Sequence, residues 1–240
     1  MKPFEKAFVL TSQQVDADGK AKLSALLYLC QEAAGGHCME LGLDWASLQK
    51  QGLFWALIRV GVEITRLPEA GQTVRMVTWP MPTTRTAFPR AAEGYDEAGN
   101  LLFRATSLWV LMDTQKRSML LPGKSGITLE GITLGRELPA PGSLAPQAGS
   151  LQASRRVSPA DIDRNGHVNN TRYMDWLTEL APLSRPVKAF TAGYLSEALP
   201  DQDLTLGLEK TEENWSFEVL RPRADQPEKP ERIFAAKVEF

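Results

Sequence analysis

The chain has 240 residues, of which 43% are hydrophobic, and its formal net charge is −2. This length and composition can bury a core in one large domain or in two domains of roughly 120 residues each, and they exclude a disordered chain. The small, mixed charge argues against a nucleic-acid-binding surface. The longest apolar stretches, such as residues 107–112, are too short to cross a bilayer, so we expect no membrane span.

The first half of the chain predicts one helix followed by several strands. A short strand is expected at residues 6–10, and apolar residues then recur at intervals of three and four over residues 23–41, which indicates one long helix. From residue 54 the period changes to two, which is typical of strands, and the short connections favour antiparallel pairing. These strands are expected at residues 54–64, 73–79, 86–95 and 101–112.

The second half repeats this order after a segment rich in proline and glycine. That segment, residues 122–150, indicates a linker that crosses the surface. A strand at residues 151–157 and a helix at about residues 170–181 follow, and Pro182 ends the helix. Further strands are expected at residues 187–198, 204–210, 215–220 and 232–240. One helix and one antiparallel sheet in each half favour an α+β fold with each sheet wrapped around a helix, and a generic α+β domain is the alternative.

The two cysteines fit a reducing compartment. Cys30 and Cys38 lie on the first predicted helix, roughly 12 Å apart at 1.5 Å per residue, which is too far for a disulfide. The N-terminal residues lack the apolar core of a signal peptide. We therefore expect an unexported, cytoplasmic protein.

Several catalytic patterns are missing from the sequence. It contains neither a phosphate-binding glycine loop nor a Gly-x-Ser-x-Gly nucleophile motif. His37, Cys38 and Glu40 are close in sequence, but neighbouring helix positions point about 100° apart, so these side chains do not converge on a metal ion. We expect them to pack in or around the core.

A dense group of short polar side chains stands just before the second predicted helix. Asp163, Asn165 and His167 alternate there, and His167 is one of only two histidines. They offer a proton acceptor, an amide and a titratable imidazole, while the helix N-terminus adds N–H groups that can stabilise an oxyanion. Asx residues before a helix are also ordinary caps, and for Asn169 and Asn170 capping is an equally good interpretation.

This polar group resembles the active-site signature of the acyl-ACP thioesterases. The resemblance rests on residues 163–170, followed by Tyr173 and Trp176, and extends to the strands at residues 55–79 and 104–112. It spans nearly the whole chain. It implies a tandem double hot-dog fold, in which two antiparallel sheets are each wrapped around a long helix.

The same resemblance implies how the chain is divided. An N-terminal hot-dog unit at residues 1–121 would hold the acyl-chain pocket, residues 122–150 would form the linker, and a C-terminal unit at residues 151–240 would carry the catalytic residues.

The resemblance also completes the catalytic set. In that family a glutamate on the strand after the second helix belongs to the site, and Glu197 stands at that place. Taken alone, Glu197 would be an ordinary solvated strand carboxylate. Plant members usually carry a cysteine directly after this glutamate, whereas this chain has Ala198, so water is the implied nucleophile. The implied catalytic residues are Asp163, Asn165, His167 and Glu197, with either Glu197 or His167 as general base and without a metal or organic cofactor.

The implied reaction is hydrolysis of fatty acyl-[acyl-carrier-protein], which releases a free fatty acid and ends fatty acid synthesis. The alternatives are an acyl-CoA thioesterase, a non-catalytic acyl-binding hot-dog protein and a hot-dog dehydratase. Acyl carrier protein is the expected partner, and because it is acidic we expect a basic docking patch. Its candidate residues are Arg155, Arg156, Arg164 and Arg172. Monomer and homodimer both stay open.

Overall fold

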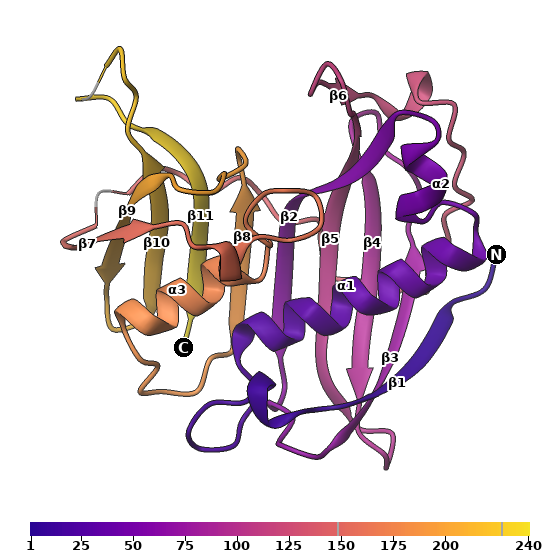
Figure 1. The fold of residues 1–240 in the computed structure, drawn as a ribbon. Coiled ribbons are helices and arrows are strands. Elements are labelled where there is room, and N and C mark those ends of the chain that lie inside the picture. The colour runs from indigo at the N-terminus through magenta and orange to yellow at the C-terminus, as the bar shows by residue number, and fades with distance from the viewer. Residues whose placement is uncertain (148, 227) are drawn as a thin grey trace. The chain divides into compact units, whose positions relative to one another are not determined.

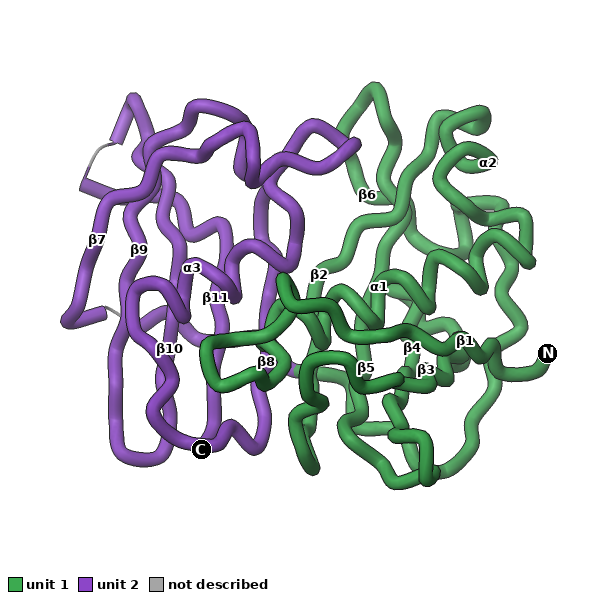
Figure 2. The backbone as a smooth tube through the Cα atoms, turned by 60° about the horizontal axis from the view of Figure 1, so that its bottom comes forward, with its two compact units in different colours: residues 1–141 green, residues 142–240 purple. Residues whose placement is uncertain are grey.

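The computed structural model describes residues 1–147, 149–226 and 228–240. The chain divides into two compact units, Met1–Pro141 and Gly142–Phe240 (Figure 2). None of the helices in the described part of the chain has the length and apolarity needed to cross a membrane.

Unit 1 is an antiparallel sheet with one long helix, α1 (Leu23–Glu40), against a face (Figure 1). The strands lie in the order β1, β3, β4, β5, β2, and β6 pairs with β5. Their bounds are β1 (Phe4–Val9), β2 (Leu53–Ile64), β3 (Thr73–Pro80), β4 (Phe88–Tyr95), β5 (Leu101–Asp113) and β6 (Met119–Leu120). Leu26 and Ala33 of α1 are completely buried. The predicted long helix and the antiparallel strands of this half are therefore confirmed.

A close contact between α1 and β1 explains why glycine interrupts the helix. A Cβ atom at Gly36 would lie 2.7 Å from the ring of Phe4, so β1 can approach only where the helix has no side chain. The Phe4 ring also stacks on the imidazole of His37, with ring centroids 5.7 Å apart. His37 is buried, which confirms its predicted place in the core.

The first part of the predicted linker packs on the opposite face of this sheet. Side chains alternate between the two faces along a strand, and Trp79 and Glu93 point away from α1. The indole of Trp79 donates to Glu137 at 3.0 Å, and Glu93 pairs with Arg136 at 2.9 Å. Ile132 packs against Trp79 and its buried neighbours. The segment therefore covers a face of unit 1 before the chain enters unit 2.

Unit 2 has its own antiparallel sheet and its own helix, α3 (Arg172–Leu180). The strands lie in the order β8, β11, β10, β9, β7. Their bounds are β7 (Leu151–Arg156), β8 (Ala189–Tyr194), β9 (Asp203–Lys210), β10 (Asn214–Arg221) and β11 (Glu231–Glu239). Aromatic contacts hold α3 on the sheet, because Tyr173 stacks on Phe234 of β11 with centroids 4.5 Å apart and meets Tyr194 of β8 edge-on.

The sequence analysis missed one element and misplaced the end of another. The short helix α2 (Trp45–Gln49) was not predicted, and Asp44 caps it, since its side chain accepts hydrogen bonds from the N–H groups of Ala46 and Ser47. The strand expected at residues 187–198 ends at Tyr194. It ends there because the N–H groups of Leu195 and Ser196 both donate to the carbonyl of Ile233, which breaks the regular ladder.

Candidate active site

A tight turn just before α3 presents the polar residues. The N–H of Asp163 donates to the carbonyl of His167 at 2.9 Å, and the N–H of Gly166 donates to the carbonyl of Asp163 at 3.0 Å. Gly166 has a φ of 83°, in the left-handed region that glycine adopts without strain. Three bonds of the turn thus fix the direction of Asp163, Asn165 and His167, since the side chain of Asp163 also accepts from the N–H of Asn165 at 2.7 Å.

The imidazole of His167 lies between two carboxylates. Its Nε2 atom is 3.7 Å from Oε1 of Glu197, and its Nδ1 atom is 3.9 Å from Oδ1 of Asp163. Both distances are longer than a direct hydrogen bond, and they are short enough for one shared water or a small rotation. The His167 side chain is 13% exposed and that of Glu197 is 34% exposed, so solvent reaches the carboxylate more readily than the imidazole.

Asp163 also orients the side chain of Asn165. The amide Nδ2 of Asn165 donates to Oδ2 of Asp163 at 3.4 Å. The structure therefore brings together all four residues that the sequence analysis proposed for the site: Asp163, Asn165, His167 and Glu197.

The two asparagines that follow belong to the start of the helix. Oδ1 of Asn169 accepts from both the N–H and the hydroxyl of Thr171, the N-cap residue of α3, at 2.9 Å, which forms an Asx turn just before the helix. The carbonyl of Asn170 accepts from the phenol of Tyr194 at 2.9 Å. Asn169 therefore has a local structural role in the turn before α3, and Thr171 is the N-cap residue.

Glu197 lies in the loop after β8, and not on the strand where it was expected. The N–H of Val168 donates to the carbonyl of Ala198 at 2.9 Å, which joins this loop to the turn that carries His167. The loop departs from the sheet at Leu195 and Ser196, so the Glu197 side chain is not confined to either face of the sheet.

Arg221, at the end of β10, holds the Glu197 loop from its other side, and sequence reasoning missed this residue. Its guanidinium donates to the carbonyl of Glu197 at 2.8 Å and to the hydroxyl of Ser196 at 3.0 Å. Glu231, at the start of β11, in turn accepts from Arg221 at 2.6 Å. An arginine followed by proline at a strand end gives no sequence signal for this contact.

Unit 1 contains the same turn without the candidate catalytic groups. The N–H of Asp16 donates to the carbonyl of Lys20 at 2.8 Å, and Oδ1 of Asp16 accepts from the N–H of Asp18 at 3.0 Å. Asp18 and Lys20 thus occupy the places that Asn165 and His167 have in unit 2. Because the turn forms with aspartate and lysine, turn building does not account for the amide or the imidazole.

The loop that carries Glu197 has a counterpart in unit 1 as well. There the N–H groups of Thr65 and Arg66 both donate to the carbonyl of Leu102, at 2.8 and 3.0 Å, in the pattern that precedes Glu197. Counting from this pattern places Leu67 where unit 2 has Glu197. A leucine therefore suffices to build such a loop, and architecture alone does not explain a carboxylate there.

A buried aspartate, Asp161, joins the segment before the turn to α3. Asp161 accepts from Ser158, from Nε of Arg172 at 3.0 Å and from the indole of Trp176 at 3.3 Å. Burial of Asp161 disfavours its charged form, but the hydrogen bonds from Ser158 and Arg172 outweigh that effect and hold its pKa below the usual range. Arg155 also lies 3.5 Å from this carboxylate.

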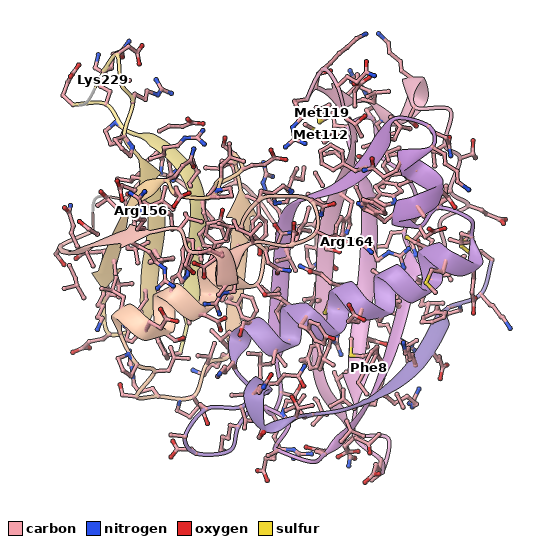
Figure 3. All side chains as sticks on the ribbon, viewed as in Figure 1. Phe8, Met112, Met119, Arg156, Arg164 and Lys229 are labelled. Atoms are coloured by element: carbon pink, nitrogen blue, oxygen red, sulfur yellow. The ribbon has the colours of Figure 1, made fainter. Side chains whose placement is uncertain are left out.

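Arg155, Arg156 and Arg172, which were suggested for a docking patch, form ion pairs within unit 2. Arg155 and Arg172 both meet Asp161, and Arg156 lies 3.3 Å from Asp203. Figure 3 shows Arg156 on the exposed strand β7. Ion pairing reduces the positive potential that these side chains offer to an acidic partner.

Two family models match the chain. The model of the acyl-ACP thioesterase N-terminal domain matches residues 1–121, and that of the acyl-ACP thioesterase C-terminal domain matches residues 145–225.

The chain is also similar to curated acyl carrier protein thioesterases. The palmitoyl-acyl carrier protein thioesterase of Gossypium hirsutum is 29% identical over 234 residues, which cover 88% of this chain and 56% of the relative. The dodecanoyl-[acyl-carrier-protein] hydrolase of Cinnamomum camphora is 27% identical over 220 residues, covering 84% of this chain and 58% of the relative. Both relatives are described as chloroplastic. The chain thus spans little more than half the length of the curated relatives it matches.

Solved structures match over the whole chain. An acyl-ACP thioesterase from Bacteroides thetaiotaomicron superposes with a TM-score of 0.84 at 23% identity, covering 99% of this chain and 97% of that one. The 12:0-ACP thioesterase of Umbellularia californica superposes with a TM-score of 0.79 at 24% identity, covering 99% and 96%. These likenesses give the fold, the predicted tandem double hot-dog. Together with the two family models, they lead to the conclusion that the chain belongs to the acyl-ACP thioesterase family.

Proposed function

We propose that this protein hydrolyses the thioester of fatty acyl-[acyl-carrier-protein] and releases the free fatty acid. The observation that carries the proposal is the placement of His167 between Asp163 and Glu197, at 3.9 and 3.7 Å, in a chain of this family. The turn and loop of unit 1 repeat the backbone arrangement with Lys20 and Leu67 at the places of His167 and Glu197. The imidazole of His167 and the carboxylate of Glu197 are therefore better explained by a catalytic role than by the need to build the turn and the loop.

In this proposal a water that touches both Glu197 and His167 is the nucleophile. Glu197 is the general base, since it is the more exposed of the two groups, and it takes the proton as the water attacks the thioester carbonyl. His167 lies beside the carboxylate, receives this proton from Glu197 and gives it to the thiolate once the C–S bond has broken. Asp163 holds the turn that aims His167 and Asn165.

The carbonyl oxygen becomes negative as water adds to the carbon. We assign its stabilisation to the side-chain amide of Asn165 and to an N–H group at the start of α3, where the helix dipole favours negative charge. The leaving group is the thiolate of the carrier's pantetheine. A thiol has a pKa of about 8.5, so it departs without a strong general acid.

Further parts of the proposal concern the substrate and its setting. Unit 1 would hold the acyl chain between α1 and the sheet, where apolar side chains such as Leu27, Leu57 and Val60 meet. Acyl carrier protein would present the thioester to unit 2. The two cysteines are unlinked, which suits a reducing compartment such as the cytoplasm.

The test is to incubate the protein with a ladder of acyl-ACPs and to identify the free acids and the released thiol. We expect one acid for each thiol. The same acyl chains on coenzyme A form the second arm, and kcat/KM should be higher on the protein carrier. Thiol release from neither carrier would overturn the proposal, and a higher kcat/KM on coenzyme A would reassign the carrier.

A further inference from the structure

The phenol of Tyr194 joins the two segments that carry His167 and Glu197. Tyr194 ends β8, three residues before Glu197, and its hydroxyl donates to the carbonyl of Asn170 at 2.9 Å. Asn170 stands three residues after His167, in the turn before α3. One side-chain hydrogen bond therefore ties the backbone beside the imidazole to the backbone beside the carboxylate.

Tyr173 reaches the same loop from the helix. It lies in the first turn of α3, is 2% exposed, and its phenolic oxygen accepts a hydrogen bond from the N–H of Ala198. Burial raises the pKa of this phenol, the N–H of Ala198 opposes the rise, and the charges of Glu197 and Asp163 add to it, so the hydroxyl lies near both carboxylates. The ring of Tyr173 also meets that of Tyr194 edge-on, with centroids 6.0 Å apart.

The matching turn and loop of unit 1 form without a phenol at this loop. In unit 1 the N–H of Ala21 donates to the carbonyl of Pro68 at 2.8 Å. In unit 2 the N–H of Val168 donates to the carbonyl of Ala198 at 2.9 Å, so Pro68 stands where unit 2 has Ala198. Because proline has no N–H, the hydrogen bond that Ala198 donates to a phenol cannot form in unit 1.

Tyr194 has an apolar counterpart in unit 1. The two hydrogen bonds to one carbonyl, which place Leu67 at the position of Glu197, also place Ile64 at that of Tyr194. The strand β2 ends at Ile64 just as β8 ends at Tyr194. An isoleucine therefore suffices to end such a strand, and it has no hydroxyl group to donate.

Tyr173 has an apolar counterpart as well. The N–H of Arg172 and the N–H of Ala25 each donate to the carbonyl three residues earlier, both at 3.0 Å, which aligns the first turns of α3 and α1. The residue after Arg172 is Tyr173, and the residue after Ala25 is Leu26, which is completely buried. Packing of the helix on its sheet thus requires an apolar side chain at this position but no hydroxyl group.

We propose that Tyr194 and Tyr173 are positioning residues, which hold the imidazole of His167 and the carboxylate of Glu197 close enough to share one water. This inference rests on the proposed function, because it assumes that these two groups act together in hydrolysis. The architecture explains the two aromatic rings by packing, whereas it does not explain their hydroxyl groups. In this role neither phenol exchanges a proton with the substrate.

The separation that the two phenols maintain is the 3.7 Å between Nε2 of His167 and Oε1 of Glu197. One water can bridge two groups at this separation, and a misplacement of about 1 Å can cost up to about a hundredfold in rate. Tyr194 also fixes the start of α3, whose N–H groups stabilise the oxyanion in the proposed mechanism. Loss of its hydroxyl group should therefore lower kcat and leave KM nearly unchanged.

The test measures steady-state kinetics of Tyr194→Phe and Tyr173→Phe on one acyl-ACP. Each change keeps the ring and removes only a hydroxyl group, so the packing of the core is preserved. We expect kcat to fall about tenfold for each variant with little change in KM. Tyr95→Phe is the matched control, because it removes the hydrogen bond from Tyr95 to Glu93 at 2.7 Å in unit 1 and should keep the wild-type kcat.

A double variant separates positioning from a general loss of stability. If Tyr194 acts by placing Glu197, it has no base left to place once that carboxylate is gone. Tyr194→Phe should therefore lower kcat far less in the Glu197→Gln background than in the wild type. Losses of kcat that multiply in the double variant would overturn the positioning role.

The imidazole of His167 gives a readout that does not depend on hydrolysis. The chain has two histidines, so His37 of unit 1 is an internal reference. Tyr194→Phe should shift the ring-proton NMR signals of His167 and leave those of His37 in place. A wild type that hydrolyses acyl-ACP, with the same kcat in Tyr194→Phe and Tyr95→Phe, would overturn this inference and leave the proposed function intact. A shift of the His167 signals in a protein that releases no thiol would support the positioning role and overturn the proposed function instead.

Discussion

Arg221 donates a hydrogen bond to the main-chain carbonyl of Glu197, with 2.8 Å between Nη1 and the oxygen atom. This contact fixes the backbone of the loop and leaves the carboxylate itself to face His167. Because Glu231 holds Arg221 at 2.6 Å, the position of Glu197 depends on two strand ends that lie ten residues apart in sequence. Arg221 is in this sense a positioning residue, since it acts through the placement of Glu197.

Replacing Arg221 by methionine should lower kcat about tenfold to a hundredfold with little change in KM, because a displacement of the base by about 1 Å costs about that much. Arg221→Lys should recover part of the loss, since lysine can still reach one acceptor. Steady-state kinetics on one acyl-ACP measure both effects. Arg156→Met on the exposed strand β7 is the matched control. Equal losses of kcat in Arg221→Met and Arg156→Met would rule out the positioning role.

Removing the proposed base or its imidazole partner should lower kcat far more than the loss of Arg221 does. We expect Glu197→Gln and His167→Ala each to lower kcat by about 10²–10⁴, because a general base contributes that range to the rate. Glu179→Gln, an exposed carboxylate on α3, serves as the control. Thiol release is the measurement, with circular dichroism to check folding. Near-normal kcat in both folded variants would contradict the proposed mechanism.

Asp161 should make the stability of unit 2 depend on pH. Its pKa is lowered in the folded state, so its contribution is present above its unfolded pKa of about 3.9 and is lost as the pH falls through the folded value. Asp161→Asn leaves Arg172 and Arg155 without their buried carboxylate, which should cost about 3 kcal/mol at pH 7.

Urea unfolding of the wild type and Asp161→Asn at neutral pH and near pH 3 tests this expectation. The difference in the free energy of unfolding between the two proteins should narrow as the pH falls, because the wild-type carboxylate is then partly protonated. A difference that stays constant, or that widens toward acid pH, would show that the charge of Asp161 is not what stabilises the site.

Periodicity in the sequence predicted the elements that repeat a simple pattern. The helix α1 and the strands that follow it were predicted from the change of period after residue 53, from three and four to two. Periodicity could not predict how the segment after β6 packs. Proline and glycine mark an irregular backbone there, but they do not indicate which surface the segment covers. Contacts such as Trp79 with Glu137 depend on the finished sheet.

The candidate site was predictable to the extent that its residues are neighbours in sequence. The alternation of Asp163, Asn165 and His167 was visible because one turn holds all three. Glu197 entered only through resemblance to a family, and Arg221 did not enter at all. Both reach the site through the pairing of β8, β10 and β11, and this pairing joins positions that are far apart along the chain.

The paired turns of the two units allow folding and catalysis to be separated. Gly166 and Gly19 each close a turn with a positive φ, 83° and 76°, and a Cβ atom at either place would meet nothing within 4 Å. Alanine at each position should therefore cost about the same stability, roughly 1 kcal/mol, from backbone strain alone. Only Gly166→Ala should also lower kcat, because the strained turn shifts Asn165 and His167, whereas the unit 1 turn carries Asp18 and Lys20. Urea unfolding and steady-state kinetics on the two variants measure the two quantities. If Gly19→Ala lowered kcat as much as Gly166→Ala, the loss would reflect general destabilisation, and the turn before α3 would have no special part in catalysis.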